Sequence, residues 1–346
     1  MVWYALSVAD KPDVPIGDVE RFLVEHHRGP IDSLAPLAGG FWSAAYSYRV
    51  GDQDLVLRLG TIPEGFDADR AAMAFDAPDL PVPTIVAIGH AFNVGYAISE
   101  RHFGRFLEDV RAEESPRSAP MLSRLLRALR TIEERPDLSV FGQPAHVALQ
   151  DSWRNNLERQ LVDDGTSRTA GWRTALRHNP ELDRLFRACE QRIVGLRDAC
   201  TERRHVVHGD LLYQNVLISE DASTVTGVFS WKHSMRGDFL WDTAYCTFFS
   251  SWYPGVDAAD PWAATLATST PKQRRDAEAR HHCYELTIGA RRLGDYVYTN
   301  DEQNLNAARR RLAEILERGP RTSPVRTDPP RGCPLVSRSS GSPDRG

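Results

Sequence analysis

The hydrophobic pattern of the chain changes near Glu100, and this change limits the folds that are available to it. Before this point the sequence predicts short strands, among them residues 45–50, where side chains alternate, and residues 55–59. After it, residues 121–134 and 182–201 place leucine, isoleucine and alanine three and four positions apart, which is typical of helices. A chain of 346 residues is also long for one core. We therefore predict an α+β fold with two lobes, an antiparallel sheet in the first and mainly helices in the second.

These patterns divide the chain into three segments. Residues 1–100 form the predicted N-lobe, and residues 101–318 form the helical C-lobe, which also contains a strand pair at 215–218 and 225–229. Residues 319–346 are rich in Pro, Arg, Ser and Gly and hold few apolar side chains. Such a segment buries too little apolar surface to fold, so we expect a disordered tail.

The charge and cysteine content argue against several classes of protein. The net charge is −5, whereas a sequence-independent nucleic-acid binder needs a cationic surface; mild acidity suits a cationic small molecule. No window approaches about 18 apolar residues, and the first residues lack a basic stretch before an apolar run, so neither a membrane span nor a signal peptide is predicted. The five cysteines form no C-x-x-C pair, which fits a reducing cytoplasm. We expect a cytoplasmic monomer that binds neither nucleic acid nor membrane.

The strongest local signal is the run from His208 to Asn215, which reads H-G-D-x-x-x-x-N and ends at a predicted strand. Phosphoryl transfer needs a carboxylate to orient the acceptor hydroxyl and an oxygen ligand for the metal ion that binds the phosphates. Asp210 and Asn215, on one loop, supply these two groups. An aspartate and an asparagine at this spacing also occur in ordinary turns. The preceding His-Gly and the apolar strand that follows favour the catalytic interpretation.

This run resembles the Brenner-type motif of the aminoglycoside phosphotransferase and choline kinase superfamily, whose fold is similar to that of protein kinases. Downstream, residues 228–231 resemble the apolar pair, metal-binding position and aromatic residue of that superfamily, and residues 237–242 match its G-D-x-x-x-D. The resemblance covers roughly residues 18–317 and implies a bilobal protein-kinase-like fold. Further segments are similar to hygromycin B phosphotransferases in particular: 65–70, 81–83, 96–99, 152–154 and 248–252.

The resemblance implies a role for each polar residue of these C-lobe motifs. Asp210 corresponds to the catalytic base and Asn215 to a ligand of Mg²⁺. His208 would be a structural residue beneath the loop, as a lone histidine beside an apolar strand would also be. Asp242 would hold the catalytic loop through backbone hydrogen bonds, and Asp238 would do the same.

The superfamily also places a cation on the third strand of the N-lobe, where it binds the nucleotide phosphates. No lysine lies between Lys11 and Lys232, so an arginine must serve, and Arg58 occupies the corresponding position. Alternation alone fits a solvent-facing strand residue equally well, and the resemblance favours the nucleotide-binding role. A carboxylate of the next helix should pair with this arginine; Asp69 is the first candidate and Asp67 the second.

Two further segments of the N-lobe are expected to contact the nucleotide. Gly39, Gly40 and Ser43 occupy the hairpin that covers the phosphates, where backbone N–H groups at a glycine turn can bind anions, although the segment is not a full G-x-G-x-x-G. Backbone groups near Ser99 and Arg101, at the connection between the lobes, are expected to face the adenine edge.

The acceptor site is expected on the C-lobe, after the catalytic segment. Trp241, Tyr245 and Trp252 are candidates for its floor, although aromatic side chains at this spacing are more often part of a core. The resemblance implies a kinase that uses ATP or GTP with Mg²⁺ to phosphorylate a hydroxyl of an aminoglycoside-like sugar antibiotic, an activity that gives antibiotic resistance.

Position 230 departs from the superfamily, which has a metal-binding aspartate there. Ser230 lies between the expected Phe229 and Trp231, so a shift of one position does not explain it. A neutral hydroxyl coordinates Mg²⁺ without adding charge, and loss of the carboxylate should cost on the order of several kcal/mol of transition-state stabilisation. Three interpretations follow: a weak or differently metallated kinase, a pseudokinase that binds nucleotide or antibiotic, and an enzyme that uses an acid from elsewhere in space.

Overall fold

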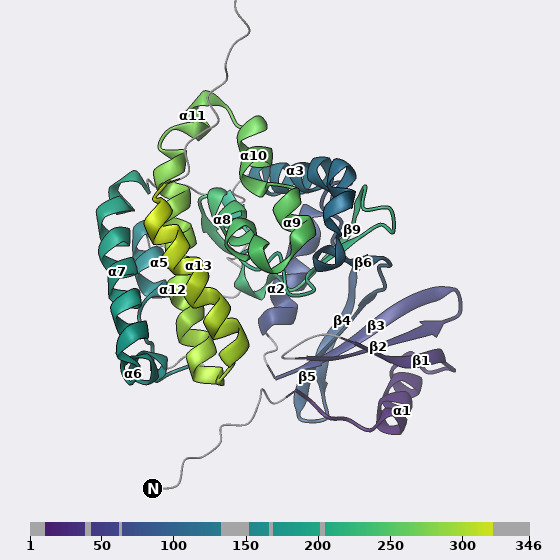
Figure 1. Ribbon diagram of the computed structural model, residues 1–346. Helices are drawn as coiled ribbons and strands as arrows, with labels where there is room; N and C mark the ends of the chain where they lie inside the picture. Colours follow the sequence, from purple (N-terminus) through teal and green to yellow (C-terminus); the bar gives the residue numbers. More distant parts are fainter. Residues whose placement is uncertain are drawn as a thin grey trace, which may run out of the picture.

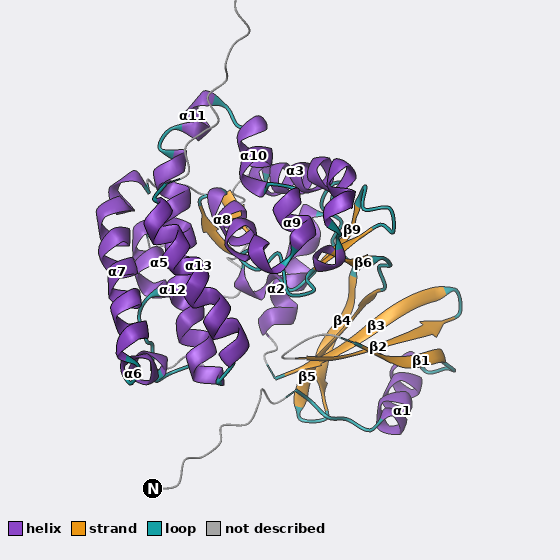
Figure 2. Cartoon of the chain, viewed as in Figure 1, coloured by secondary structure: helices purple, strands orange, loops and turns teal. Residues whose placement is uncertain are grey.

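The computed structural model describes residues 11–38, 43–61, 64–132, 152–165, 169–200 and 205–320. Its N-terminal part is a five-stranded antiparallel sheet with the strand order β1-β2-β3-β5-β4 (Figures 1 and 2). The strands of this sheet are β1 (Asp32–Leu37), β2 (Ser43–Val50), β3 (Gln53–Gly60), β4 (Ile85–Ala91) and β5 (Val94–Glu100).

One face of the sheet is covered by helix α1 (Ile16–His27), and this packing sets the direction of every side chain on β3. Val19 and Leu23 of α1 are buried in one cluster with Leu57 and its neighbours two positions away on the strand. Successive strand residues point to opposite faces. Arg58 therefore points away from α1, toward the other face of the sheet.

Helix α2 (Glu64–Ala72) follows β3 in sequence and lies between the sheet and the helices, in the middle of Figure 1. Ala68, Ala72 and Phe75 belong to the large hydrophobic cluster of the helical part, and the Phe75 ring lies 5.8 Å from that of Trp231. The first residues of α2 therefore follow strand β3, and its apolar face packs against the helical lobe.

The remainder of the described chain is mainly helical, as Figure 2 shows. Short antiparallel pairings interrupt the helices and frame the 208–215 loop: β6 (Arg105–Phe106) with β8 (Val216–Ile218) and β9 (Val225–Val228), and β7 (His205–Val207) with β10 (Met235–Gly237). The helices are α3 (Ser115–Thr131), α5 (Trp153–Gln160), α6 (Trp172–Arg177), α7 (Pro180–Leu196), α8 (Leu240–Phe249), α9 (Pro254–Ala258), α10 (Pro261–Ala267), α11 (Pro271–Arg274), α12 (Ala277–Thr299) and α13 (Glu302–Arg318).

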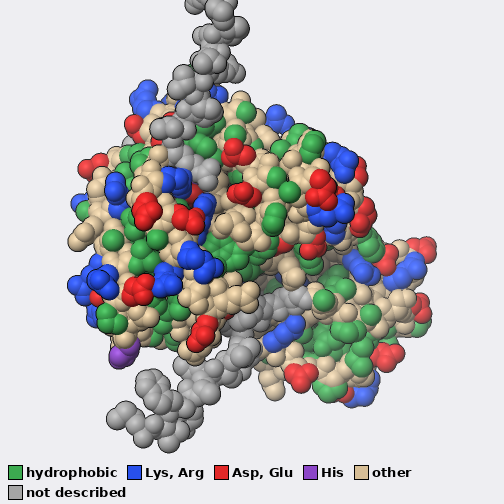
Figure 3. Space-filling model, in the orientation of Figure 1, with side chains coloured by type: hydrophobic (Ala, Val, Ile, Leu, Met, Phe, Trp, Pro, Cys, Tyr) green, Lys and Arg blue, Asp and Glu red, His purple; other side chains and the backbone are tan. Residues whose placement is uncertain are grey.

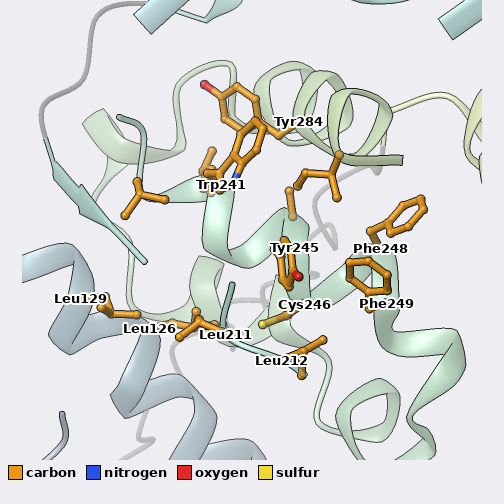
Figure 4. Close-up of a cluster of buried hydrophobic side chains, with 14 of the residues drawn as sticks. Leu126, Leu129, Leu211, Leu212, Trp241, Tyr245, Cys246, Phe248, Phe249 and Tyr284 are labelled. Carbon is orange, nitrogen blue, oxygen red and sulfur yellow. The ribbon is translucent and has the colours of Figure 1, made fainter. Parts of the chain in front are cut away.

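Helix α8 is the centre of the helical lobe, because every one of its residues is buried. Figure 4 shows its aromatic side chains together with Tyr284 of α12 and two leucines of the 208–215 loop, Leu211 and Leu212. Both leucines are fully buried. The loop therefore rests on the core at two adjacent positions, which restricts its path.

The surface charge and the length of the helices concern two expected absences, that of a nucleic-acid-binding surface and that of a membrane span. Among the described residues on the face in Figure 3, basic and acidic side chains are interspersed over the helical lobe. None of the helices in the described ranges is long and apolar enough to cross a membrane. The predicted tail lies almost entirely outside the described residues, which end at Pro320 just after α13.

Candidate active site

The 208–215 loop brings together the two residues that the motif predicts. The amide nitrogen of Asn215 donates to Oδ2 of Asp210 (3.0 Å) and to the backbone carbonyls of Asp210 (2.8 Å) and Leu212 (2.9 Å). An amide that uses its nitrogen in this way turns its oxygen in the opposite direction. Asn215 therefore offers a neutral oxygen donor beside the carboxylate, which is a group that binds hard cations.

The start of the loop is held by a buried carboxylate of α8. Asp242 accepts hydrogen bonds from the backbone N–H groups of His208 (2.9 Å) and Gly209 (2.8 Å). Burial raises the pKa of Asp242, and the two N–H groups act in the opposite direction by stabilising the charged form. Gly209 has φ +79°, and a Cβ there would lie 2.6 Å from the carbonyl oxygen of His233, so this position requires glycine.

The ring of His208 is fully buried and both of its nitrogens are used. Nδ1 accepts from the backbone N–H of Asp210 (3.2 Å), and Nε2 lies 2.9 Å from the carbonyl oxygen of Phe229. This pattern requires a neutral ring with the proton on Nε2. The histidine thus links the base of the loop to the segment that contains Ser230.

Ser230 and Asn215 lie on neighbouring backbone segments, because the N–H of Phe229 donates to the carbonyl oxygen of Asn215 (2.9 Å). Ser230 has φ 63° and ψ 56°, a left-handed conformation that aspartate and asparagine tolerate better than most residues. Among the described residues, no three His, Cys, Asp or Glu side chains gather where they could hold a metal ion. The oxygen donors here suit Mg²⁺ in kind, but Asn215 and Ser230 add no charge to the site.

Asp69 of α2 connects this segment to the sheet. One carboxylate oxygen pairs with Arg58 of β3, and the other accepts the backbone N–H of Trp231 at 2.8 Å. Asp67, the second candidate, is exposed and pairs with Arg70 on its own helix at 2.6 Å. Of the two candidate carboxylates, Asp69 is therefore the one that pairs with Arg58.

The other residues expected at the nucleotide lie on β2, on β5 and just after β5, or fall outside the described residues. Ser43 opens β2 and pairs with Gly60, while Gly39 and Gly40 lie outside the described residues. Ser99 is buried on β5. Arg101 donates its backbone N–H to Asp54 (3.0 Å) and stacks its guanidinium 4.8 Å from the ring of Phe103, so that N–H group is already used within the sheet.

Two of the three aromatic candidates for the acceptor floor pack or bond to other parts of the helical lobe. The ring of Trp241 is buried in the core, against Trp153 (5.6 Å) and Tyr284 (5.8 Å; Figure 4), which is the alternative that its spacing also allowed. Trp252 is half-buried and donates to Asn304 of α13 at 3.3 Å.

Asp238 has other partners than the backbone of the 208–215 loop, which it was expected to hold. Its carboxylate pairs with Arg280 and accepts the hydroxyl of Tyr284 (2.9 Å), both on α12, and it caps the backbone N–H of Leu240 (3.2 Å). Asp238 therefore joins α8 to α12, whereas Asp242 holds the loop. The G-D-x-x-x-D pattern fixes the spacing of these carboxylates but not their partners.

Comparison with known proteins identifies the family of the chain. The model of the phosphotransferase enzyme family matches residues 33–278, most of the chain. The chain belongs to the phosphotransferase enzyme family. A curated relative, hygromycin-B 4-O-kinase of Escherichia coli, is 27% identical in an alignment 350 positions long that covers 96% of this chain and 96% of the relative.

Solved structures show the same fold as this phosphotransferase. Aminoglycoside phosphotransferase APH(4)-Ia has a TM-score of 0.73 at 23% identity, over 88% of this chain and 99% of that chain. A thermostable mutant of it, in a ternary complex with AMP-PNP and hygromycin B, has a TM-score of 0.72 at 24% identity, over 87% and 98%. Spectinomycin phosphotransferase APH(9)-Ia, with ADP and spectinomycin, has a TM-score of 0.56 at 11% identity, over 88% and 98%. The expected family and the bilobal kinase-like fold are therefore confirmed.

The sequence of the phosphotransferase gave no signal for one residue at its site, Arg292 of α12. Its Nη2 lies 3.6 Å from Oδ1 of Asp210 and donates to the Tyr245 hydroxyl at 2.8 Å. Tyr245 in turn donates to Oδ1 of Asp210. Arg292 lies in an otherwise ordinary amphipathic helix, and only the packing of α12 against α8 brings it to the loop.

Proposed function

We propose that this phosphotransferase transfers the γ-phosphoryl group of ATP or GTP to a hydroxyl of an aminoglycoside-like antibiotic. The observation that carries the proposal is the arrangement of Asp210, Asn215 and Ser230 on adjacent backbone segments, with Arg58 linked to the same segment through Asp69. In support, the relative from Escherichia coli is named for phosphorylating hygromycin B. Solved neighbours are complexes with AMP-PNP or ADP and an antibiotic.

Each of these side chains has a task in the proposed reaction. Asp210 orients the acceptor hydroxyl and takes its proton as the oxygen forms a bond to the γ-phosphorus and the bond to the β-phosphate oxygen breaks. Arg58, held by Asp69, balances the charge of the nucleotide phosphates. The oxygens of Asn215 and Ser230 would hold Mg²⁺, which neutralises phosphate charge when it is bound.

A second function is a protein that binds nucleotide or antibiotic with impaired transfer. The observation that favours it is Ser230, because no carboxylate stands at that metal position. Asp69, which bonds the backbone of the next residue, does not supply the missing ligand, because it already uses one oxygen on Arg58 and the other on the N–H of Trp231.

The two functions are separated by measuring γ-phosphate transfer from ATP to a panel of aminoglycosides. We expect wild type to transfer phosphate and Asp210→Asn to lose transfer by about a thousandfold, with ATP binding retained. Binding is followed by the thermal shift with ATP and Mg²⁺. Wild type that binds ATP but transfers nothing, together with an active Ser230→Asp variant, would establish the binding protein instead.

We further propose that the protein acts as a monomer in the cytoplasm. The described cysteines, Cys189, Cys200, Cys246 and Cys283, are all free and buried, which fits a reducing compartment.

A further inference from the structure

The two oxygens of the Asp210 carboxylate have different surroundings. Oδ2 accepts one hydrogen bond, from the Asn215 amide at 3.0 Å. Oδ1 accepts the Tyr245 hydroxyl and also faces Nη2 of Arg292 at 3.6 Å. A carboxylate has about four acceptor positions, two on each oxygen. The Tyr245 hydroxyl and the Arg292 cation both lie on the side of Oδ1, so the second acceptor position of Oδ2 is the one left for a further donor.

The tyrosine that faces Oδ1 is fixed as a donor. Its hydroxyl accepts from Arg292 at 2.8 Å, so its own proton is directed to Asp210. Burial raises the pKa of Tyr245 well above its ordinary value, which keeps the hydroxyl protonated. The ring is fixed as well, because it packs 4.9 Å from the ring of Phe249 within α8.

The guanidinium of Arg292 is held from several sides. It lies 5.5 to 5.8 Å from the ring centres of Tyr213, Tyr245 and Phe249, and Nη1 is 3.4 Å from the Asp295 carboxylate. An arginine among aromatic rings and carboxylates loses little further freedom when it holds another group. Arg292 and Tyr245 therefore form a rigid support behind Asp210.

We propose that Tyr245 and Arg292 are positioning residues that hold Oδ1 of Asp210 and thereby present Oδ2 to the acceptor hydroxyl. The inference rests on the proposed transfer reaction. The acceptor O–H donates to Oδ2, its proton passes to Asp210 as the new O–P bond forms, and the nucleoside diphosphate leaves with the electrons of the broken P–O bond. Tyr245 and Arg292 exchange no proton in this step; they fix the rotation of the carboxylate.

The test compares kcat and KM for wild type, Tyr245→Phe, Arg292→Gln and Arg292→Lys. Tyr245→Phe keeps the ring but removes the donor, so kcat should fall about 10- to 100-fold while KM for ATP stays within about twofold. Arg292→Gln should lower kcat similarly, and Arg292→Lys should regain part of the loss because it restores the charge without the planar fork. The double variant Tyr245→Phe/Arg292→Gln should be little worse than either single variant, because both act on one oxygen.

The matched control is Arg291→Gln. Arg291 is the next residue on α12, and it pairs with Thr169 (2.8 Å) and with Oδ1 of Asp295 (3.2 Å), whereas Arg292 faces Oδ2 of that carboxylate. The contacts of Arg292 with Asp210 and Tyr245 stay in place in this variant, so its kcat should equal that of wild type. The inference is overturned if Tyr245→Phe and Arg292→Gln keep the wild-type kcat, if only KM changes, or if Arg291→Gln loses as much. Should Tyr245→Phe fail to fold, the Arg292 variants decide, since that side chain is partly exposed. Absence of transfer in wild type is a different result, which overturns the proposed function and this inference with it.

Discussion

At the scale of single residues, Ser230 has a backbone conformation that is unusual for its side chain. Its left-handed conformation is one in which aspartate and asparagine are common and serine is not. The carbonyl of Asn215, bonded to Phe229, keeps this backbone beside the other proposed metal ligand. The backbone is therefore already suited to the carboxylate that the side chain lacks.

Ser230→Asp should raise the Mg²⁺-dependent transfer rate by about a hundredfold, because it adds a charged oxygen ligand without new backbone strain. ADP release measured across a Mg²⁺ titration should also reach half of its maximum at a lower Mg²⁺ concentration. Ser230→Asn is the control, since it suits the same backbone but carries no charge. Equal activity of the Asp and Asn variants would mean that the missing charge does not limit the reaction.

At the scale of elements, α2 connects the sheet to residues 230 and 231 through one side chain. Asp69 pairs with Arg58 on β3 and accepts the N–H of Trp231 next to Ser230. The apolar face of α2 packs with the helical lobe. In the proposed function, a nucleotide bound by Arg58 would be positioned by the same helix that supports residues 230 and 231.

Asp69→Asn should raise KM for ATP by about tenfold, because a neutral amide loses the charge-assisted bond to Arg58 while it keeps an oxygen for Trp231. Steady-state kinetics with ATP as the varied substrate measures this change. Asp67→Asn on the same helix removes only an exposed pair with Arg70 and should leave KM unchanged. A tenfold effect in both variants would assign the change to α2 as a whole rather than to Asp69.

The elements that the sequence predicts well are those whose pattern reflects one buried face. Alternation at residues 45–50 and 55–59 corresponds to β2 and β3, because α1 covers one face of their sheet. The helical spacing at 121–134 and 182–201 corresponds to α3 and α7, with ends that differ by several residues. The three-residue strands β7 and β10 pair across the motif segment and are too short to show any period.

The residues of the candidate site that the sequence predicts lie in local motifs, apart from the pair of Arg58 with Asp69, which the resemblance implies. Asp210, Asn215 and Asp242 lie in the H-G-D-x-x-x-x-N and G-D-x-x-x-D runs, and the loop geometry follows from them. Trp241 and Arg292 differ because their surroundings depend on how α8 packs with α12, which spacing within one segment does not encode. The same packing turns Asp238 toward α12.

At the scale of the whole molecule, α12 places several titratable side chains in the centre of the helical lobe. Arg280 pairs with Asp238, and Glu285 pairs with Arg318 of α13 at 2.6 Å. These pairs join α8, α12 and α13 through charge as well as through apolar contact. His282 is different, because it is fully buried and neither ring nitrogen meets a hydrogen-bond partner in the part of the chain that the structure describes.

His282 should make the stability of the protein depend on pH. Burial lowers its pKa from 6.5 to about 4; the Glu285 carboxylate opposes this shift, and Arg318, Arg192 and His281 add to it. Between pH 6.5 and 4 the unfolded chain therefore binds a proton that the folded chain does not, so stability falls as the pH falls. At about 1.4 kcal/mol per pH unit, this one residue accounts for about 3 kcal/mol of lost unfolding free energy by pH 4.

Urea unfolding between pH 7.5 and 4.5, compared for wild type and His282→Phe, isolates that contribution. The variant should lose less stability across this range, because its apolar ring has no proton to gain in the unfolded state and needs no partner in the folded one. The comparison uses the slope with pH, since the larger ring can also change stability at every pH by altering the packing. His178→Phe, at an exposed position after α6, should keep the wild-type slope. If the slopes of His282→Phe and wild type coincide, the acid sensitivity of the lobe belongs to the charged pairs of α12, and the buried imidazole has no part in it.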